Sequence, residues 1–347
     1  MPPNAFTGQG VGGINDVAEG QSVLVAVGQL GCAATVWVSE DGLSWSHVPY
    51  DESVFAGSLG TGAGGACSSI NRVVAGPSGF VALGGGFESG ESISISPRLW
   101  TSPDGVSWTP LTQEEAGLGD RFLQITHVVS GGAGWVVFGG SCSETPQEAI
   151  ELFESEESLP NCPVAIWTSS DGANWEKVPH DDEVFGDTGT RIRSVTQGPN
   201  GLIAAGTTVD GLTIWSSADG RIWKRTTLSG SAFGADLPDF VVGDTQGLVA
   251  VGVFDQKCVP IETEKQAALA THWGCELQNG SPGIHQSEAQ VWTSLDGATW
   301  TPSLSDVKVP GFAFADAAVK FQSGLIVAAT DTEPTSHQVL LRWTPGT

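Results

Sequence analysis

Charged side chains recur where short apolar strands begin, at the six positions Asp16, Arg72, His127, Arg193, Asp239 and Asp316. Carboxylates, guanidinium groups and an imidazole around one opening can bind a charged or hydroxylated ligand. Two carboxylates roughly 5 to 10 Å apart also suffice for glycoside hydrolysis, which makes the three aspartates candidate catalytic groups. The alternative is that these side chains pair with one another and solvate a channel.

A tryptophan outside any repeat, Trp273, is a further candidate for ligand contact. Its ring can stack on a sugar or on a partner protein, or it can anchor the small core of its own loop. The glutamate-rich segment 144–157 lacks the spacing of a calcium loop. We therefore expect no cofactor and no metal, with calcium as the alternative. The sequence also lacks a nucleophile elbow, a phosphate-binding loop and a zinc-protease motif.

The elements that would position these residues are repeated along the chain. The pattern Trp-x-Ser-x-Asp-Gly-x-x-Trp occurs at Trp37–Trp45, Trp100–Trp108, Trp167–Trp175, Trp215–Trp223 and Trp292–Trp300, with a partial copy at Val339–Trp343. Upstream of each copy lies an apolar strand, a turn and a second apolar strand. Each unit therefore predicts four strands, named A to D, and Asp-Gly predicts the turn between C and D.

Six such units predict an all-β fold, a six-bladed β-propeller that forms a single domain over residues 1–347. The predicted blades cover roughly residues 14–49, 70–111, 125–179, 192–227, 238–304 and 315–347. The last unit lacks its D strand. Repetition at a fixed offset is a packing signature, so we expect the repeated tryptophans to build blades and not a sugar platform.

The stretch Ser39-x-Asp41-Gly42-x-x-Trp45 and its equivalents resemble the Asp-box, or BNR, repeat, with one residue fewer between Asp and Gly. The resemblance implies a propeller with structural aspartates at its C–D turns, here Asp41, Asp104, Asp171, Asp219 and Asp296. Asp-box families include sialidases, other glycosidases, sorting receptors and assembly factors, so the resemblance implies fold and little chemistry. Sialidase is excluded because Tyr50 has no evident carboxylate partner and the Arg-Ile-Pro motif is absent.

Net charge and hydropathy limit the partners. The chain carries 39 acidic residues against 14 Lys plus Arg, a net charge of −25. Such a surface repels phosphate backbones, so we expect no nucleic-acid partner. No apolar run reaches the roughly 18 residues of a membrane-spanning helix. Low Lys with many Gly, Ala and Asp favours a bacterial source.

Six cysteines lie in predicted loops and none forms a C-x-x-C pair. Each long B–C insertion holds its own pair, and the remaining two would meet on the same face, which predicts the bridges Cys32–Cys67, Cys142–Cys162 and Cys258–Cys275. Disulfides indicate an oxidising compartment, hence a secreted or cell-surface, extracytoplasmic protein. The alternative is a cytoplasmic protein with free thiols. Residues 1–6 do not resemble a signal peptide, so we expect a trimmed form with an added Met.

These observations favour an extracellular recognition or scaffold propeller, which binds a glycan or a protein partner through its B–C and D–A loops. The alternative is an extracellular glycoside hydrolase or lyase with a carboxylate pair at the channel mouth.

Overall fold

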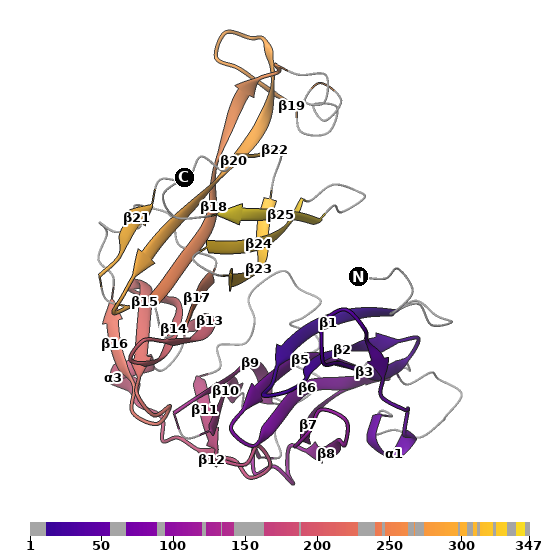
Figure 1. Cartoon of the computed structure of the whole chain (residues 1–347). Coiled ribbons are helices and arrows are strands. Elements are labelled where there is room, and N and C mark those ends of the chain that lie inside the picture. The colour runs from indigo at the N-terminus through magenta and orange to yellow at the C-terminus, as the bar shows by residue number, and fades with distance from the viewer. Residues whose placement is uncertain are drawn as a thin grey trace. The chain divides into compact units, whose positions relative to one another are not determined.

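The computed structural model describes residues 12–55, 67–88, 94–119, 123–132, 134–141, 163–186, 189–227, 240–244, 247–262, 267, 274–297, 299–303, 308–310, 313–321, 324–331 and 338–343. Antiparallel strands dominate this part of the chain (Figure 1). The helices α1 (Glu52–Phe55) and α3 (Asp182–Phe185) are single turns. No helix in the described ranges is long and apolar enough to cross a membrane.

The chain divides into two compact units, and unit 1 comprises residues 1–189 with 219–221. It holds three sheets in which the strands pair in chain order. The first sheet is β1 (Gly12–Glu19), β2 (Leu24–Leu30), β3 (Ala33–Ser39) and β4 (Ser46–His47). The second is β5 (Cys67–Gly76), β6 (Gly79–Glu88), β7 (Ser94–Ser102) and β8 (Thr109–Thr112). The third is β9 (Leu123–Gly131), β10 (Gly134–Ser141), β11 (Val164–Ser169) and β12 (Glu176–Lys177).

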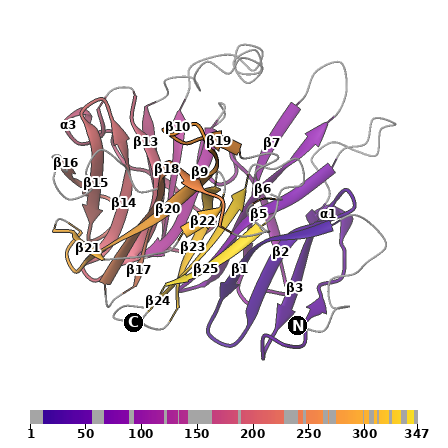
Figure 2. The same cartoon turned by 90° about the horizontal axis from the view of Figure 1, so that it is seen from above.

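Unit 2 comprises residues 190–218 and 222–347. The fourth sheet of the chain is β13 (Arg191–Gly198), β14 (Gly201–Thr208), β15 (Gly211–Ser217) and β16 (Lys224–Thr227), which lie side by side in Figure 2. The fifth is β17 (Phe240–Asp244), β18 (Gly247–Pro260), β19 (Gly274–Glu276), β20 (Pro282–Ser294), β21 (Thr301–Ser303) and β22 (Lys308–Pro310). The sixth is β23 (Ala313–Phe321), β24 (Gly324–Asp331) and β25 (Gln338–Trp343).

The predicted antiparallel meander is confirmed in the first four sheets. The fifth is larger because its B–C insertion continues the long hairpin β18–β20, on which β19 also pairs. The sixth sheet has three strands in the described residues.

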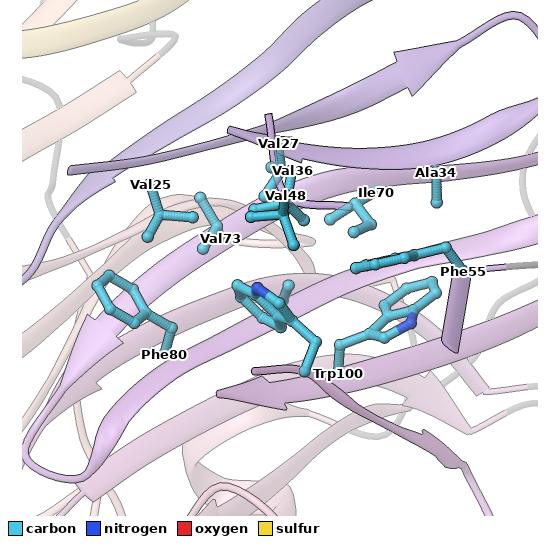
Figure 3. Close-up of a cluster of buried hydrophobic side chains, with 12 residues drawn as sticks. Val25, Val27, Ala34, Val36, Val48, Phe55, Ile70, Val73, Phe80 and Trp100 are labelled. Carbon is cyan, nitrogen blue, oxygen red and sulfur yellow. The ribbon is translucent and has the colours of Figure 1, made fainter. Parts of the chain in front are cut away.

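The core lies between sheet faces. In Figure 3, Val25, Val27 and Val36 of the first sheet face the rings of Phe80 and Trp100 of the second. The first tryptophan of each full repeat is almost fully buried, with exposed fractions of 4% for Trp37, 0% for Trp100, 1% for Trp167, 0% for Trp215 and 2% for Trp292. Burial of such large rings is the main apolar stabilisation of these sheets, and the predicted packing role of the tryptophans follows from it.

The turn between the third and fourth strands is longer than the tight hairpin that Asp-Gly predicts. In the first sheet residues 40–45 separate β3 from β4. Asp41 Oδ1 accepts hydrogen bonds from the amides of Leu43 at 2.8 Å and Ser44 at 2.7 Å, and the indole of Trp45 donates to the carbonyl of Gly42 at 3.2 Å. Gly42 has a φ of 69°, which a side chain disfavours. These internal bonds let the longer loop act as one fixed turn.

Candidate functional site

The first strand of five sheets carries one extra residue in its first half. The pairing of β1 with β2 shifts between Ile14 and Asp16, so Asn15 is a β-bulge. The same shift recurs in β5, β9, β13 and β23, with extra residues Asn71, Thr126, Arg193 and Asp316. A bulge twists the strand and re-aims the side chains beside it.

A glycine stands opposite the bulge in the second strand because the two backbones approach closely there. A Cβ placed on Gly84 would lie 2.0 Å from the carbonyl oxygen of Ser69, and one on Gly28 would lie 2.0 Å from that of Gly13. The equivalent distance at Gly206 is 1.9 Å to the carbonyl oxygen of Arg191. Backbone atoms cannot yield as a side chain can, so glycine is sterically required at these three positions.

The bulges change how the six charged candidates relate to one another. Asp16, Arg72 and His127 come directly after the bulge, whereas Arg193 and Asp316 are the extra residues themselves. They were expected at one equivalent position, and the structure distributes them over two consecutive ones. An alignment of these segments without gaps separates the same two positions, because Arg193 aligns with Asn71 and Ser194 with Arg72. Asp239 lies outside the described residues.

Asp16 is joined directly to the second sheet. Its Oδ2 accepts a hydrogen bond from the backbone amide of Val73 at 3.0 Å, and its Oδ1 accepts one from the amide of Val17 at 2.9 Å. Burial raises the pKa of Asp16 above its ordinary value, although both amides and the Arg72 guanidinium oppose that rise. The result is a half-buried carboxyl with an increased affinity for a proton.

Two asparagines that the sequence analysis missed extend this contact. The amide of Asn15 donates to Ser69 Oγ at 3.0 Å and to the Ile70 carbonyl at 2.9 Å, and Ser69 Oγ donates to Asn71 Oδ1 at 2.9 Å. Asn15 and Asn71 are exposed bulge residues of neighbouring sheets. The sequence does carry a signal for these two residues, because an Asn directly precedes both Asp16 and Arg72. We call Asn15, Asp16, Ser69, Asn71 and Arg72 the polar junction.

A disulfide frames the polar junction. Cys32, between β2 and β3, is bonded to Cys67 at the start of β5, with Cα atoms 4.2 Å apart. The amide of Ser68 donates to the Cys32 carbonyl at 3.1 Å, and Ser68 Oγ donates to the Phe55 carbonyl at 2.6 Å. The strand start that carries Asn71 and Arg72 is therefore tied to the first sheet and to α1.

The remaining candidates have no contact with the polar junction in the hydrogen bonds described, or lie outside the described residues. His127 Nδ1 is 3.0 Å from Thr126 Oγ1 in β9. The predicted bridge Cys258–Cys275 is present. It joins β18 to β19, the short strand that pairs with β20. Trp273 and the pair Cys142 and Cys162 fall outside the described residues. Within the ranges described, no three His, Cys, Asp or Glu side chains are grouped so as to hold a metal ion.

The repeated aspartates stabilise turns. Oδ1 of Asp104 accepts from the amides of Val106 and Ser107, and Oδ1 of Asp171 from those of Ala173 and Asn174. Asp296 accepts from the amide of Thr299 at 2.7 Å and Asp219 from that of Arg221 at 2.8 Å. These bonds hold the pKa of Asp171 well below its usual range, chiefly through the amide and side chain of Asn174.

No family model matches the sequence, and no curated protein matches it. Among solved structures, the chain resembles a protein of unknown function from Dyadobacter fermentans, at 14% identity and a TM-score of 0.43, over 95% of this chain and 93% of that one. It also resembles a GH43 endo-arabinanase from Bacillus licheniformis, at 10% identity and a TM-score of 0.33, over 94% of this chain and 91% of that one.

A GH32 β-fructofuranosidase from Bombyx mori, crystallised as a mutant with sucrose, is similar at 13% identity and a TM-score of 0.36. That likeness covers 84% of this chain, which spans 63% of the Bombyx mori protein. At such identities a likeness concerns the path of the chain alone.

Proposed function

We propose that this chain is a six-bladed β-propeller of Asp-box type, secreted or displayed on a bacterial surface, which binds a glycan through the polar junction. The observation that carries the proposal is the row of exposed planar polar groups at one strand edge, formed by Asn15, Asn71 and Arg72 around the carboxyl of Asp16. Amide, guanidinium and carboxylate groups close together offer both donors and acceptors to the hydroxyl groups of a sugar.

Rigidity supports a recognition role. The Cys32–Cys67 disulfide and the bonds of Asn15 and Asp16 to β5 fix the row before any ligand arrives. A preorganised site loses little side-chain entropy on binding, so a shallow surface can hold a sugar with few contacts. The bulges serve the same end, because they aim consecutive polar side chains out of the sheet edge.

The test is a glycan-array screen of the oxidised protein with the variants Asn71→Ala and Arg72→Ala. Loss of a charged hydrogen bond costs about 1.5 to 3 kcal/mol, so Arg72→Ala should weaken binding roughly tenfold or more. The matched control is Gln21→Ala, an exposed polar residue in the turn at the other end of β1. Trp273→Ala tests the separate prediction that this tryptophan stacks on the ligand.

Retention of binding in both junction variants would place the site elsewhere. Absence of binding to every glycan would overturn the carbohydrate proposal and leave a protein partner for the same surface.

A glycoside hydrolase is the second candidate, because burial raises the pKa of Asp16, which is the direction that a general acid requires. Incubation of any bound glycan with wild type and Asp16→Asn decides between the two functions. Turnover that disappears in the variant, with binding retained, would establish the enzyme.

A further inference from the structure

Unit 1 contains two grooves of the same construction, at the end of the sheets that carries the Asp turns. The first groove lies between the first and second sheets and is lined by Glu40, Asp41, Ser46, Phe80, Asp104 and Val106, among others. The second lies between the third sheet and the turn Asp219–Arg221, and its lining includes Thr168, Asn174, Glu176 and Arg221. Their volumes are about 820 Å³ and about 200 Å³.

An internal ion pair occupies the second groove. Arg221 Nη2 lies 2.7 Å from Glu176 Oε2, and the side chains of Arg221 and Glu176 are 54% and 72% exposed. The amide of Arg221 also donates to Asp219 Oδ1 at 2.8 Å, which fixes the start of the arginine side chain. The guanidinium therefore lies along the groove and reaches the carboxylate on its far wall.

The first groove has no such pair because both positions hold other residues. Ser46 pairs with Val38 as Glu176 pairs with Thr168, so Ser46 stands where Glu176 stands. Val106 follows Asp104-Gly105 as Arg221 follows Asp219-Gly220, and it is 48% exposed. No Lys, Arg or His occurs among the described residues that line this groove.

Carboxylates remain in the first groove without a cation. Glu40, Asp41 and Asp104 are exposed. The amides of Ser44 and Leu43 hold the pKa of Asp41 below its usual value. For Asp104 burial acts in the opposite direction, but the amides of Ser107 and Val106 outweigh it and its pKa is also lowered. The carboxyls of Asp41 and Asp104 are therefore ionised at neutral pH, and the net charge of −25 adds to the attraction for a cation.

We propose that the first groove binds an arginine side chain on an extended segment of a partner protein. The partner's arginine would occupy the position that Arg221 occupies in the second groove. Phe80, Val106 and Pro103 supply apolar walls for the methylene stem, and Glu40 with the two aspartates supplies oxygen atoms for the guanidinium. A volume of about 820 Å³ lies within the range of ligand pockets, roughly 300–1,000 Å³, so neighbouring residues of the segment fit as well.

This site is separate from the proposed glycan site. Ser69, Asn71 and Arg72 of the polar junction belong to β5 but do not line the first groove, whereas the groove includes Gly76 at the end of that strand. A variant in one site therefore leaves the other intact, and the two proposals fail or succeed independently.

The probe is a blocked peptide, acetyl-Gly-Gly-Arg-Gly-Gly-amide, titrated into the oxidised protein at low salt and followed by NMR chemical shifts. Its neutral match carries citrulline in place of arginine and should bind at least about tenfold more weakly, the effect of losing one charged hydrogen bond. Glu40→Gln should also weaken the arginine peptide several-fold.

The decisive variant is Val106→Arg, which places an internal guanidinium in the first groove as the second groove already has. It should abolish peptide binding. Leu43→Arg is the matched control, because Leu43 occupies the same place in the turn of the first sheet, is 64% exposed and does not line the groove. Thermal unfolding and glycan binding of both variants should match wild type. No binding to wild type, equal binding of the citrulline peptide, or equal binding by the two arginine variants would each overturn the proposal.

Discussion

The second and third sheets of unit 1 each bury a tryptophan at the same repeat position, but the hydrogen bonding of the two indoles differs. Trp100 and Trp167 hold the same place in the repeat and are 0% and 1% exposed. The indole of Trp100 donates to the carbonyl of Val54 in α1 at 2.8 Å. The indole nitrogen of Trp167 is buried without an acceptor among the described residues, and the ammonium of Lys177 lies 5.5 Å from its ring centre.

The difference in indole hydrogen bonding shows which property of the tryptophan is common to the repeats of this chain. The connection before the second sheet forms α1, which presents a carbonyl, whereas the turn at residues 113–119 before the third sheet does not. The ring is buried in both cases. Its volume is therefore the shared requirement, and its hydrogen bond depends on the preceding connection.

Removal of either ring should have the largest effect. Trp100→Ala and Trp167→Ala should each lower the free energy of unfolding by about 3–5 kcal/mol, because each leaves a cavity among buried residues. Denaturant unfolding followed by far-ultraviolet circular dichroism measures both. Leu43→Ala is the exposed control and should stay within about 0.5 kcal/mol of wild type. A small loss at Trp167 alone would break the comparison, since packing would then differ between the sheets.

Substitution by phenylalanine should separate packing from hydrogen bonding. Trp100→Phe leaves the Val54 carbonyl without its donor, whereas Trp167→Phe removes a nitrogen that has no acceptor in the described structure. Trp100→Phe should therefore cost about 1–3 kcal/mol more than Trp167→Phe. The same unfolding assay applies. Equal costs would mean that the Trp100 bond contributes nothing net.

The sequence predicts much of this architecture because its spacing repeats. Trp pairs at a constant offset, with Asp-Gly between them, predict the four-strand meander seen in four sheets. The bridge Cys258–Cys275 was predicted because both cysteines lie in one insertion, and Cys32–Cys67 because these two would meet on the same face. Such features depend on local spacing and on strand order, and both can be read along one chain.

The polar junction was predicted only in part. Asp16 and Arg72 were singled out by charge, but Asn15 and Asn71 were missed. A bulge adds a residue without disturbing the apolar pattern, so the shift in register becomes visible only when strands are paired. The length of the Asp turn was likewise underestimated, because its stability comes from side-chain bonds that close six positions as firmly as a short hairpin.

The sheets also differ in the residue that follows the first tryptophan of each repeat. Thr168 Oγ1 is buried without a partner in the described structure, whereas the first sheet has Val38 at that place. Thr168→Val should raise the free energy of unfolding by about 1 kcal/mol, since an unsatisfied hydroxyl is removed from the interior. Thr101→Val, at the half-buried equivalent in the second sheet, is the control and should change little. A loss of stability in Thr168→Val would reveal a bond to this hydroxyl.

The smallest effect on stability should appear at acid pH, where the Asp104 turn of the second sheet and the Asp171 turn of the third sheet differ. The pKa of Asp171 is lowered by the amide and side chain of Asn174, and by more than that of Asp104, where burial offsets the amide bonds. A carboxyl whose folded pKa lies below its unfolded value contributes stability at higher pH, and that stability is lost as pH falls through the window below about 4.

Asp171→Asn should therefore flatten the fall in stability between about pH 5 and pH 2 more than Asp104→Asn does. Both carboxylates are close to solvent, so the difference between the variants should be only about 0.5 kcal/mol. Urea unfolding at several pH values measures it. Asp16→Asn should have the opposite effect, because the raised pKa of Asp16 makes the folded state lose stability as pH rises through that value. Parallel slopes for Asp171→Asn and Asp104→Asn would show that the side chain of Asn174 adds nothing to the turn, and that the two turns are held by backbone amides alone.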